Sequence, residues 1–174
     1  MRLASRCYSE GTKALVDKQL IKTVIFDLGR VLVPFDFRRG YDRLAPLCGL
    51  PAAEIPVRLA ATDLVRRYES GGIESHAFVR ELARHLNFET SYEDFCNIWS
   101  SIFLPETLIP DSMLASIAAN YRLVLLSNTN EIHFQMVRKN YSLLRHFHEC
   151  VLSYEVGAMK PSRRCSRSSG LSSE

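Results

Sequence analysis

Hydrophobic residues follow two different spacings along the chain, and the denser one marks three buried strands. Residues 23–27 read Thr-Val-Ile-Phe-Asp, residues 121–126 read Tyr-Arg-Leu-Val-Leu-Leu, and residues 150–153 read Cys-Val-Leu-Ser. Short runs of β-branched and aliphatic residues, apolar on both faces, are typical of strands inside a parallel sheet. Helical stretches near residues 113–118 and 131–145 alternate with them. This alternation predicts an α/β fold with a Rossmann-like, doubly wound parallel sheet.

Between the first two predicted strands, the hydrophobic spacing changes to that of helices. Residues 31–34 first resume an extended stretch, which Pro34 ends. From about residue 41 to residue 103, apolar positions then recur with a period of 3.6, and residues that favour turns or caps separate the stripes. We therefore expect three or four short helices, with no strand among them, as an insert over residues 37–105. Residues 21–36 and 106–161 would form the sheet domain around it.

The polar residues that follow the three predicted strands are the first candidates for chemistry. Asp27 ends the first strand, Ser127 directly follows the second, and Lys160 comes a few residues after the third. In parallel sheets, ligands bind beyond the carboxyl ends of the strands. We therefore expect a carboxylate, a hydroxyl and a cation to converge at one end of the sheet.

The segments that carry these residues resemble the motifs of a known family. Residues 24–33 read VIFDLGRVLV, residues 125–130 read LLSNTN, and residues 155–161 read EVGAMKP. They resemble motifs one, two and three of the haloacid dehalogenase-like (HAD) hydrolase superfamily, specifically of its phosphatases with an α-helical cap inserted after the first strand. YESGGIESHAF, residues 68–78, also resembles a cap segment of bacterial sugar-phosphate phosphatases in this group. The resemblance covers about residues 22–161.

The resemblance implies a catalytic role for two residues and a cofactor. Asp27 would attack the phosphorus of a phosphate monoester, such as a sugar phosphate, and water would hydrolyse the resulting aspartyl-phosphate. Lys160 would lower the negative charge on Asp27 and on the phosphoryl group. Mg²⁺ is the implied cofactor, held by Asp27 and by the backbone carbonyl of Gly29.

Motif two supplies the residues that the resemblance assigns to phosphate binding. Ser127 and the backbone N–H groups near Asn128 would hold the non-bridging oxygens. Asn130 and His133 come just after this motif. Each would either face the substrate or serve as a helix cap or surface residue.

Two departures from the family pattern lower the expected activity. Most phosphatases of the family carry a second Asp two residues after the nucleophile, as general acid and base, and Gly29 takes that place here. A missing general acid typically lowers the rate ~10²–10⁴-fold. In addition, the acidic pair of motif four and its strand do not follow Pro161. The sequence thus looks truncated before motif four, and its C-terminal strands are missing. We therefore expect weak Mg²⁺ binding and impaired activity.

The missing strand also affects the expected fold and partners. In the family, that strand packs beside the first strand, which here would become an exposed apolar edge unless an oligomer covers it. Residues 162–174 contain six serines and three arginines but one leucine. Such a segment cannot bury a core, so we expect a disordered tail.

Two other functions remain open from the sequence. A non-catalytic or vestigial binding protein would keep the fold without the metal site, and the missing motif four favours it. A haloacid dehalogenase, in which Asp attacks carbon without a metal, ranks lower. Dehalogenases of the family usually carry D-x-x-G-T, whereas residues 27–31 here read DLGRV.

Composition and charge narrow the partners and the compartment. The 174 residues are 47% hydrophobic and 24% charged with a net charge of +3, which gives no basis for a nucleic-acid surface. No apolar run is long enough to span a membrane. Five scattered cysteines without a C-x-x-C pair suit a reducing compartment such as the cytoplasm.

Residues 1–20 lack a secretory signal and are expected to be a solvated leader, with a mitochondrial presequence as the alternative. The expected partner is a small-molecule phosphate ester.

Overall fold

A computed structural model describes residues 21–162 and contains a three-stranded parallel sheet. Its strands are β1 (Thr23–Phe26), β2 (Arg122–Ser127) and β3 (Glu149–Leu152), in the order β1-β2-β3. Each lies within one residue of its predicted position, so the α/β, Rossmann-like prediction is confirmed. The predicted leader, 1–20, and all but the first residue of the predicted tail, 163–174, lie outside the described residues.

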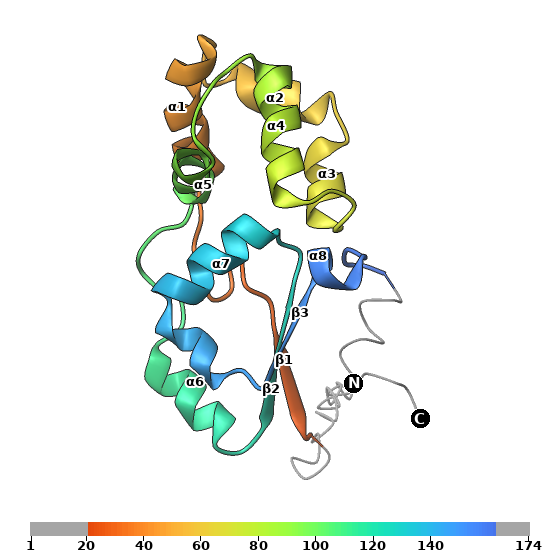
Figure 1. The fold of residues 1–174 in the computed structure, drawn as a ribbon. Helices are drawn as coiled ribbons and strands as arrows, with labels where there is room; N and C mark the ends of the chain where they lie inside the picture. The colour runs from red at the N-terminus through yellow and green to blue at the C-terminus, as the bar shows by residue number, and fades with distance from the viewer. Residues whose placement is uncertain (1–20, 163–174) are drawn as a thin grey trace, which may run out of the picture.

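The helices divide into two sets by their place in Figure 1. Five of them, between β1 and residue 101, lie beyond the carboxyl ends of the strands, and we call them the five-helix unit: α1 (Phe37–Cys48), α2 (Glu54–Ala60), α3 (Leu64–Glu69), α4 (Ser75–Leu86) and α5 (Tyr92–Ser100). The others lie beside or at the end of the sheet: α6 (Asp111–Ala118), α7 (Glu131–Asn140), the 3₁₀ helix η1 (Ser142–His146) and α8 (Ser153–Val156). Within residues 21–162, no helix is long and apolar enough to cross a membrane.

Each set of helices encloses its own hydrophobic cluster. Aromatic and aliphatic side chains from α1–α5 form the first, whose most buried members include Ile55, Tyr68, Phe78, Leu82 and Phe95. Side chains from the sheet, the turn after β1, α6 and α7 form the second, with Leu32, Leu114, Leu123, Leu125 and Val137 at its centre. The two clusters coincide with the two spacings of hydrophobic residues in the sequence.

Strand β1 is an edge of the sheet within the described chain. It pairs with β2 alone among residues 21–162, and its four residues are only half-buried. The other side of β1 therefore presents an unpaired strand edge with apolar side chains, as expected from the sequence.

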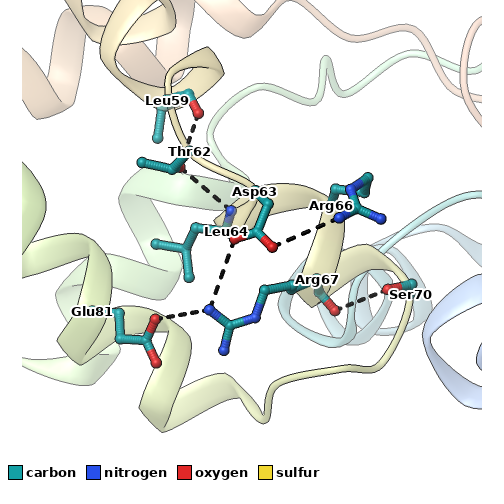
Figure 2. A network of polar contacts seen from close by, with 8 residues as sticks. All are labelled: Leu59, Thr62, Asp63, Leu64, Arg66, Arg67, Ser70 and Glu81. Atoms are coloured by element: carbon teal, nitrogen blue, oxygen red, sulfur yellow. Dashed lines mark hydrogen bonds and ion pairs between the residues drawn. The ribbon is translucent and has the colours of Figure 1, made fainter.

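The five-helix unit contains one more helix than the highest number expected, because α2 and α3 are separate. The Thr62 hydroxyl ends α2 by donating to the Leu59 carbonyl oxygen (3.0 Å) and accepts the N–H of Leu64 (3.4 Å) (Figure 2). Arg67 then contacts both Asp63 (3.9 Å) and Glu81 on α4 (3.2 Å). These side chains are at least one-third exposed, so the ion pairs orient α3 against α4 and add little stability.

A close backbone contact joins the five-helix unit to α8. Gly71 has a φ of +71°, and a Cβ atom placed on it would lie 2.1 Å from the carbonyl oxygen of Tyr154. Only glycine fits there, since any other residue must push α8 away or distort the turn after α3.

We expect Gly71→Ala to lower the free energy of unfolding by roughly 3 kcal/mol, because backbone strain adds to the clash with Tyr154. Gly49→Ala is the matched control. Gly49 also has a positive φ, +62°, but no atom lies within 4 Å of its added Cβ, so we expect a loss of about 1 kcal/mol. Urea unfolding followed by circular dichroism measures both, and equal losses would show that the Tyr154 contact costs nothing.

Candidate active site

The candidate site begins where β1 ends, at Asp27. One carboxylate oxygen, Oδ1, accepts the backbone N–H of Leu28 (2.8 Å). The other, Oδ2, accepts from Nζ of Lys160 (2.8 Å). The Asp27 side chain is 44% exposed. The carboxylate is thus held in place on one side and open to solvent on the other.

Residues at the end of β2 hold Lys160 in this position. Its Nζ also donates to the carbonyl oxygen of Leu126 (2.8 Å). The Asn128 side chain binds the backbone of residue 160 twice: Oδ1 accepts from the Lys160 N–H (2.7 Å), and Nδ2 donates to its carbonyl oxygen (3.1 Å). Asn128 therefore fixes Lys160, and its side chain is committed to that role.

Ser127 lies beside this pair on a small cavity of about 60 Å³. The Ser127 residue is buried, and its hydroxyl makes a long contact of 3.4 Å with the carbonyl oxygen of Asn128. Gly29 and Asn128 line the same cavity, which we call the small cavity. The predicted convergence of residues from the three strand ends is therefore found.

Asn130 caps α7 and lines neither the small cavity nor the adjoining larger one. Its side chain is fully buried, with Oδ1 accepting the His133 N–H (3.0 Å) and Nδ2 contacting Nδ1 of His133 (3.0 Å). The other ring nitrogen of His133, Nε2, lies 2.9 Å from the carbonyl oxygen of Trp99, which can only accept. These partners place the proton on Nε2. Of the two roles expected for Asn130, the structure provides the cap.

Burial lowers the pKa of His133 from 6.5 to about 4, although the hydrogen bond to Trp99 opposes the shift. Between these two pH values the unfolded chain binds a proton that the folded chain does not. We therefore expect the stability to be full above pH 6.5 and to fall by roughly 3 kcal/mol as the pH drops to 4.

Urea unfolding at several pH values measures this dependence in the wild type and in His133→Gln, which should lose most of it. His85→Gln, at an exposed position on α4, is the control and should keep the wild-type dependence. If His133→Gln retained the full fall, the buried imidazole would not be its source.

Gly29 leaves no room for a side chain two residues after Asp27. A Cβ atom on Gly29 would lie 2.6 Å from the ring of Phe35. That ring packs against Phe37 and Phe103, with centroid distances of 4.9 and 6.2 Å, and the Arg30 guanidinium lies 4.9 Å from its centre. A carboxylate at position 29 is therefore excluded unless Phe35 moves.

The extended stretch predicted over residues 31–34 is wrong for its first part. Residues 30–32 form a turn, in which the N–H groups of Leu32 and Val33 both donate to the carbonyl oxygen of Leu28. Arg30 takes a positive φ of 59° there, a conformation that a hydrophobic pattern does not reveal.

The oxygen atoms beside Asp27 fit a divalent cation only in part. The Asp27 carboxylate is partly exposed, and no residue of the described chain donates to the carbonyl oxygen of Gly29, which leaves that oxygen free to be a ligand. Mg²⁺ favours carboxylate and carbonyl oxygens of this kind. However, residues 21–162 contain no group of three or more His, Cys, Asp or Glu side chains that could hold a metal ion.

A larger cavity of about 360 Å³ adjoins the small one. The two share four lining residues: Phe37, Glu69, Ile102 and His133. The first three belong to the five-helix unit or the loop that follows α5, and the sequence assigned none of them a role in the site, although Glu69 lies in the cap-like segment 68–78. Only the packing of α1 and α3 over the strand ends brings them to the site, and no motif signals that packing.

Comparisons with known proteins relate the whole arrangement to one group of enzymes. No protein-family model matches the chain. D-ribitol-5-phosphate phosphatase of Bacteroides thetaiotaomicron is 24% identical over 149 residues, which cover 82% of this chain and 72% of that protein.

Solved structures give the same relation. A HAD-family enzyme of B. thetaiotaomicron, crystallised with magnesium and inorganic phosphate, superposes with a TM-score of 0.74 at 25% identity, covering 86% of this chain and 79% of that one. A protein of Porphyromonas gingivalis described as a predicted HAD-like family hydrolase superposes with a TM-score of 0.72 at 26% identity, covering 87% of this chain and 78% of that one.

Proposed function

We propose that the chain, which has the fold of the haloacid dehalogenase-like hydrolases, is a phosphatase of small-molecule phosphate monoesters. The observation that carries the proposal is the contact between Lys160 Nζ and Asp27 Oδ2, 2.8 Å long, beside the buried Ser127. A carboxylate paired with a cation next to a hydroxyl suits attack on a phosphoryl group, because the cation offsets charge on both the nucleophile and the phosphate.

In the proposed reaction, an oxygen of Asp27 attacks phosphorus and forms a P–O bond while the bond from phosphorus to the leaving alcohol breaks. Lys160 holds the carboxylate and balances the charge that accumulates on the phosphoryl oxygens, and Ser127 donates to one of these oxygens. The departing alkoxide takes its proton from water, since Gly29 offers no acid. A second water then attacks phosphorus, which frees Asp27 and releases inorganic phosphate.

Mg²⁺ is the proposed cofactor, and the carboxylate of Asp27 with the carbonyl of Gly29 would hold it. When bound, it supplies the positive charge that Lys160 alone cannot provide. Within residues 21–162, Asp27 lacks the two further metal-ligating side chains that a three-residue group would need. We therefore propose that the activity of this 174-residue chain is low.

We also propose that residues 37–105 act as a cap over the site. Phe37, Glu69 and Ile102 line the small cavity together with Gly29 and Ser127, so the five-helix unit shields this end of the sheet from water. The relation to a D-ribitol-5-phosphate phosphatase supports a small-molecule phosphate ester as the substrate, of which a sugar phosphate is one candidate.

A binding protein without catalysis is the second candidate. The absence of a complete group of metal-ligating side chains in the described residues favours it. It would bind phosphate esters between Lys160 and Ser127 but release no phosphate.

Phosphate release from p-nitrophenyl phosphate with millimolar Mg²⁺, at high protein concentration, distinguishes the two. We expect slow release that EDTA stops and that Lys160→Met lowers about a hundredfold, since a charge contact in the transition state is lost. Lys139→Met, on the exposed side of α7, is the control and should match the wild type. If Lys160→Met released phosphate as fast as the control, the site would not be catalytic, and binding of phosphate without release would favour the second candidate.

A further inference from the structure

The large cavity adjoins the small cavity, which Asp27 and Lys160 do not line but which Leu28 and Gly29, the two residues after Asp27, do. It shares Phe37, Glu69, Ile102 and His133 with the small cavity, and Met159, directly before Lys160, lines its wall. Its volume of about 360 Å³ lies within the range of small-molecule sites. A phosphate ester bound at Asp27 would therefore direct its alcohol part into the large cavity.

The wall of the large cavity is mainly aromatic and aliphatic. Its apolar side chains come from α1, α2, α3 and from α5 with the loop after it, and include Phe37, Leu44, Leu59, Val65, Trp99 and Ile102. Three of its six polar side chains already have partners, whereas the Tyr41 hydroxyl, the Glu69 carboxyl group and the buried Nε1 of Trp99 have none within the described residues. The Thr62 hydroxyl donates to Leu59, both ring nitrogens of His133 are engaged, and Arg66 contacts Asp63 (3.6 Å).

Glu69 lies where the two cavities meet. Its side chain has no hydrogen bond or ion pair with the rest of the described chain. Burial raises the pKa of this carboxyl group, so its neutral form persists to higher pH than in water. A neutral carboxyl group can donate a hydrogen bond and does not repel a phosphate.

We propose that the large cavity selects phosphate monoesters whose alcohol carries an aromatic ring or an apolar group of similar size, with Glu69 donating a hydrogen bond to an oxygen of the bound ester. This inference rests on the proposed phosphatase function. A polyol chain fits this wall less well, because the apolar side chains that make up most of it offer no partner to a hydroxyl group, whereas a ring gains by leaving water. The proposal thus separates this chain from the ribitol phosphate named for its relative.

Equilibrium binding to the 174-residue chain tests the proposal without requiring turnover. Trp99 is the single tryptophan of the sequence and lines the large cavity, so its fluorescence reports binding there. We expect benzyl phosphate to bind at least tenfold more tightly than ribitol 5-phosphate, since the buried ring adds apolar contact. Equal or tighter binding of ribitol 5-phosphate would overturn the proposal.

Two variants that fill the cavity locate the binding. Val65→Phe should weaken the binding of benzyl phosphate at least tenfold and leave the binding of inorganic phosphate unchanged. Ala60→Phe, on an exposed part of the same wall, should act alike and serves if Val65→Phe folds poorly. Val57→Phe, at a position 68% exposed and outside the cavity, is the control and should change nothing. Unchanged binding of benzyl phosphate in both cavity variants would overturn the proposal.

Variants of Glu69 test its role. Glu69→Gln keeps a hydrogen-bond donor, so its affinity for benzyl phosphate should stay within about threefold of that of the wild type. Glu69→Ala should lower this affinity more. Equal loss in both would show that the hydrogen bond is absent.

Benzyl alcohol separates failure of this proposal from failure of the phosphatase proposal. If the phosphatase proposal is wrong, inorganic phosphate will fail to bind, but benzyl alcohol should still quench Trp99 fluorescence in the wild type, and should do so less in Val65→Phe. If the proposed apolar selectivity of the large cavity is wrong, inorganic phosphate will bind and benzyl alcohol will not.

Discussion

The 174-residue polypeptide is expected to release phosphate from p-nitrophenyl phosphate about 10⁴-fold more slowly than a phosphatase of the same fold with a complete set of metal ligands. Two losses contribute, each about a hundredfold. One carboxylate and one carbonyl, the proposed ligands, would hold Mg²⁺ weakly, so the transition-state charge would be poorly balanced. In addition, within residues 21–162 β1 pairs on one side only, and we expect this to loosen the position of Asp27 relative to the phosphate.

Initial rates at saturating p-nitrophenyl phosphate and at 1 to 50 mM Mg²⁺ measure this difference, with the D-ribitol-5-phosphate phosphatase of B. thetaiotaomicron assayed beside it. The rate should keep rising with Mg²⁺ over this range, because affinity for the ion is low. A rate within tenfold of the relative would show that other groups complete the metal site.

Replacing Asp27 by Asn is expected to lower the already low phosphatase rate of the chain at least a further thousandfold. The amide oxygen is a far weaker nucleophile than a carboxylate, and Lys160 loses its anionic partner. The fold should persist, because the amide oxygen can still accept the Leu28 N–H.

Asp42→Asn, an exposed position on α1, is the matched control for this substitution and should keep the wild-type rate. Circular dichroism checks that both variants are folded. If Asp27→Asn kept more than a tenth of the wild-type rate, the nucleophile would be another group, and the catalytic role assigned to Asp27 would be lost.

The sheet and the polar cluster at its end were predictable because both depend on local sequence. The strands are short apolar runs, and β1 and β2 lead directly to Asp27 and Ser127. The parallel arrangement then requires their carboxyl ends to meet, and Lys160 follows the third strand into the same place. Strand spacing and the order of polar residues were sufficient for this part of the site.

The remaining features depend on packing between distant segments. Glu69 and Phe37 reach the site only because α3 and α1 lie over the strand ends, which a periodic pattern does not specify. The separation of α2 and α3 depends on the hydroxyl of Thr62, and the sequence does not reveal it because the apolar stripe continues across the break from Leu59 to Leu64. Similarly, whether Asn130 faces a ligand or caps α7 is decided by the position of His133.

The packing of Phe35 on Gly29 also constrains how this chain could evolve a general acid. A change of Gly29 to Asp alone brings the new side chain into the Phe35 ring, 2.6 Å from its Cβ. A smaller residue at Phe35 alone removes the ring from its contacts with Phe37 and Phe103. Each substitution made alone therefore lowers stability, and activity rises only when both are present. Selection acting on one mutation at a time would thus retain glycine at position 29. Engineering the acid would need both substitutions together.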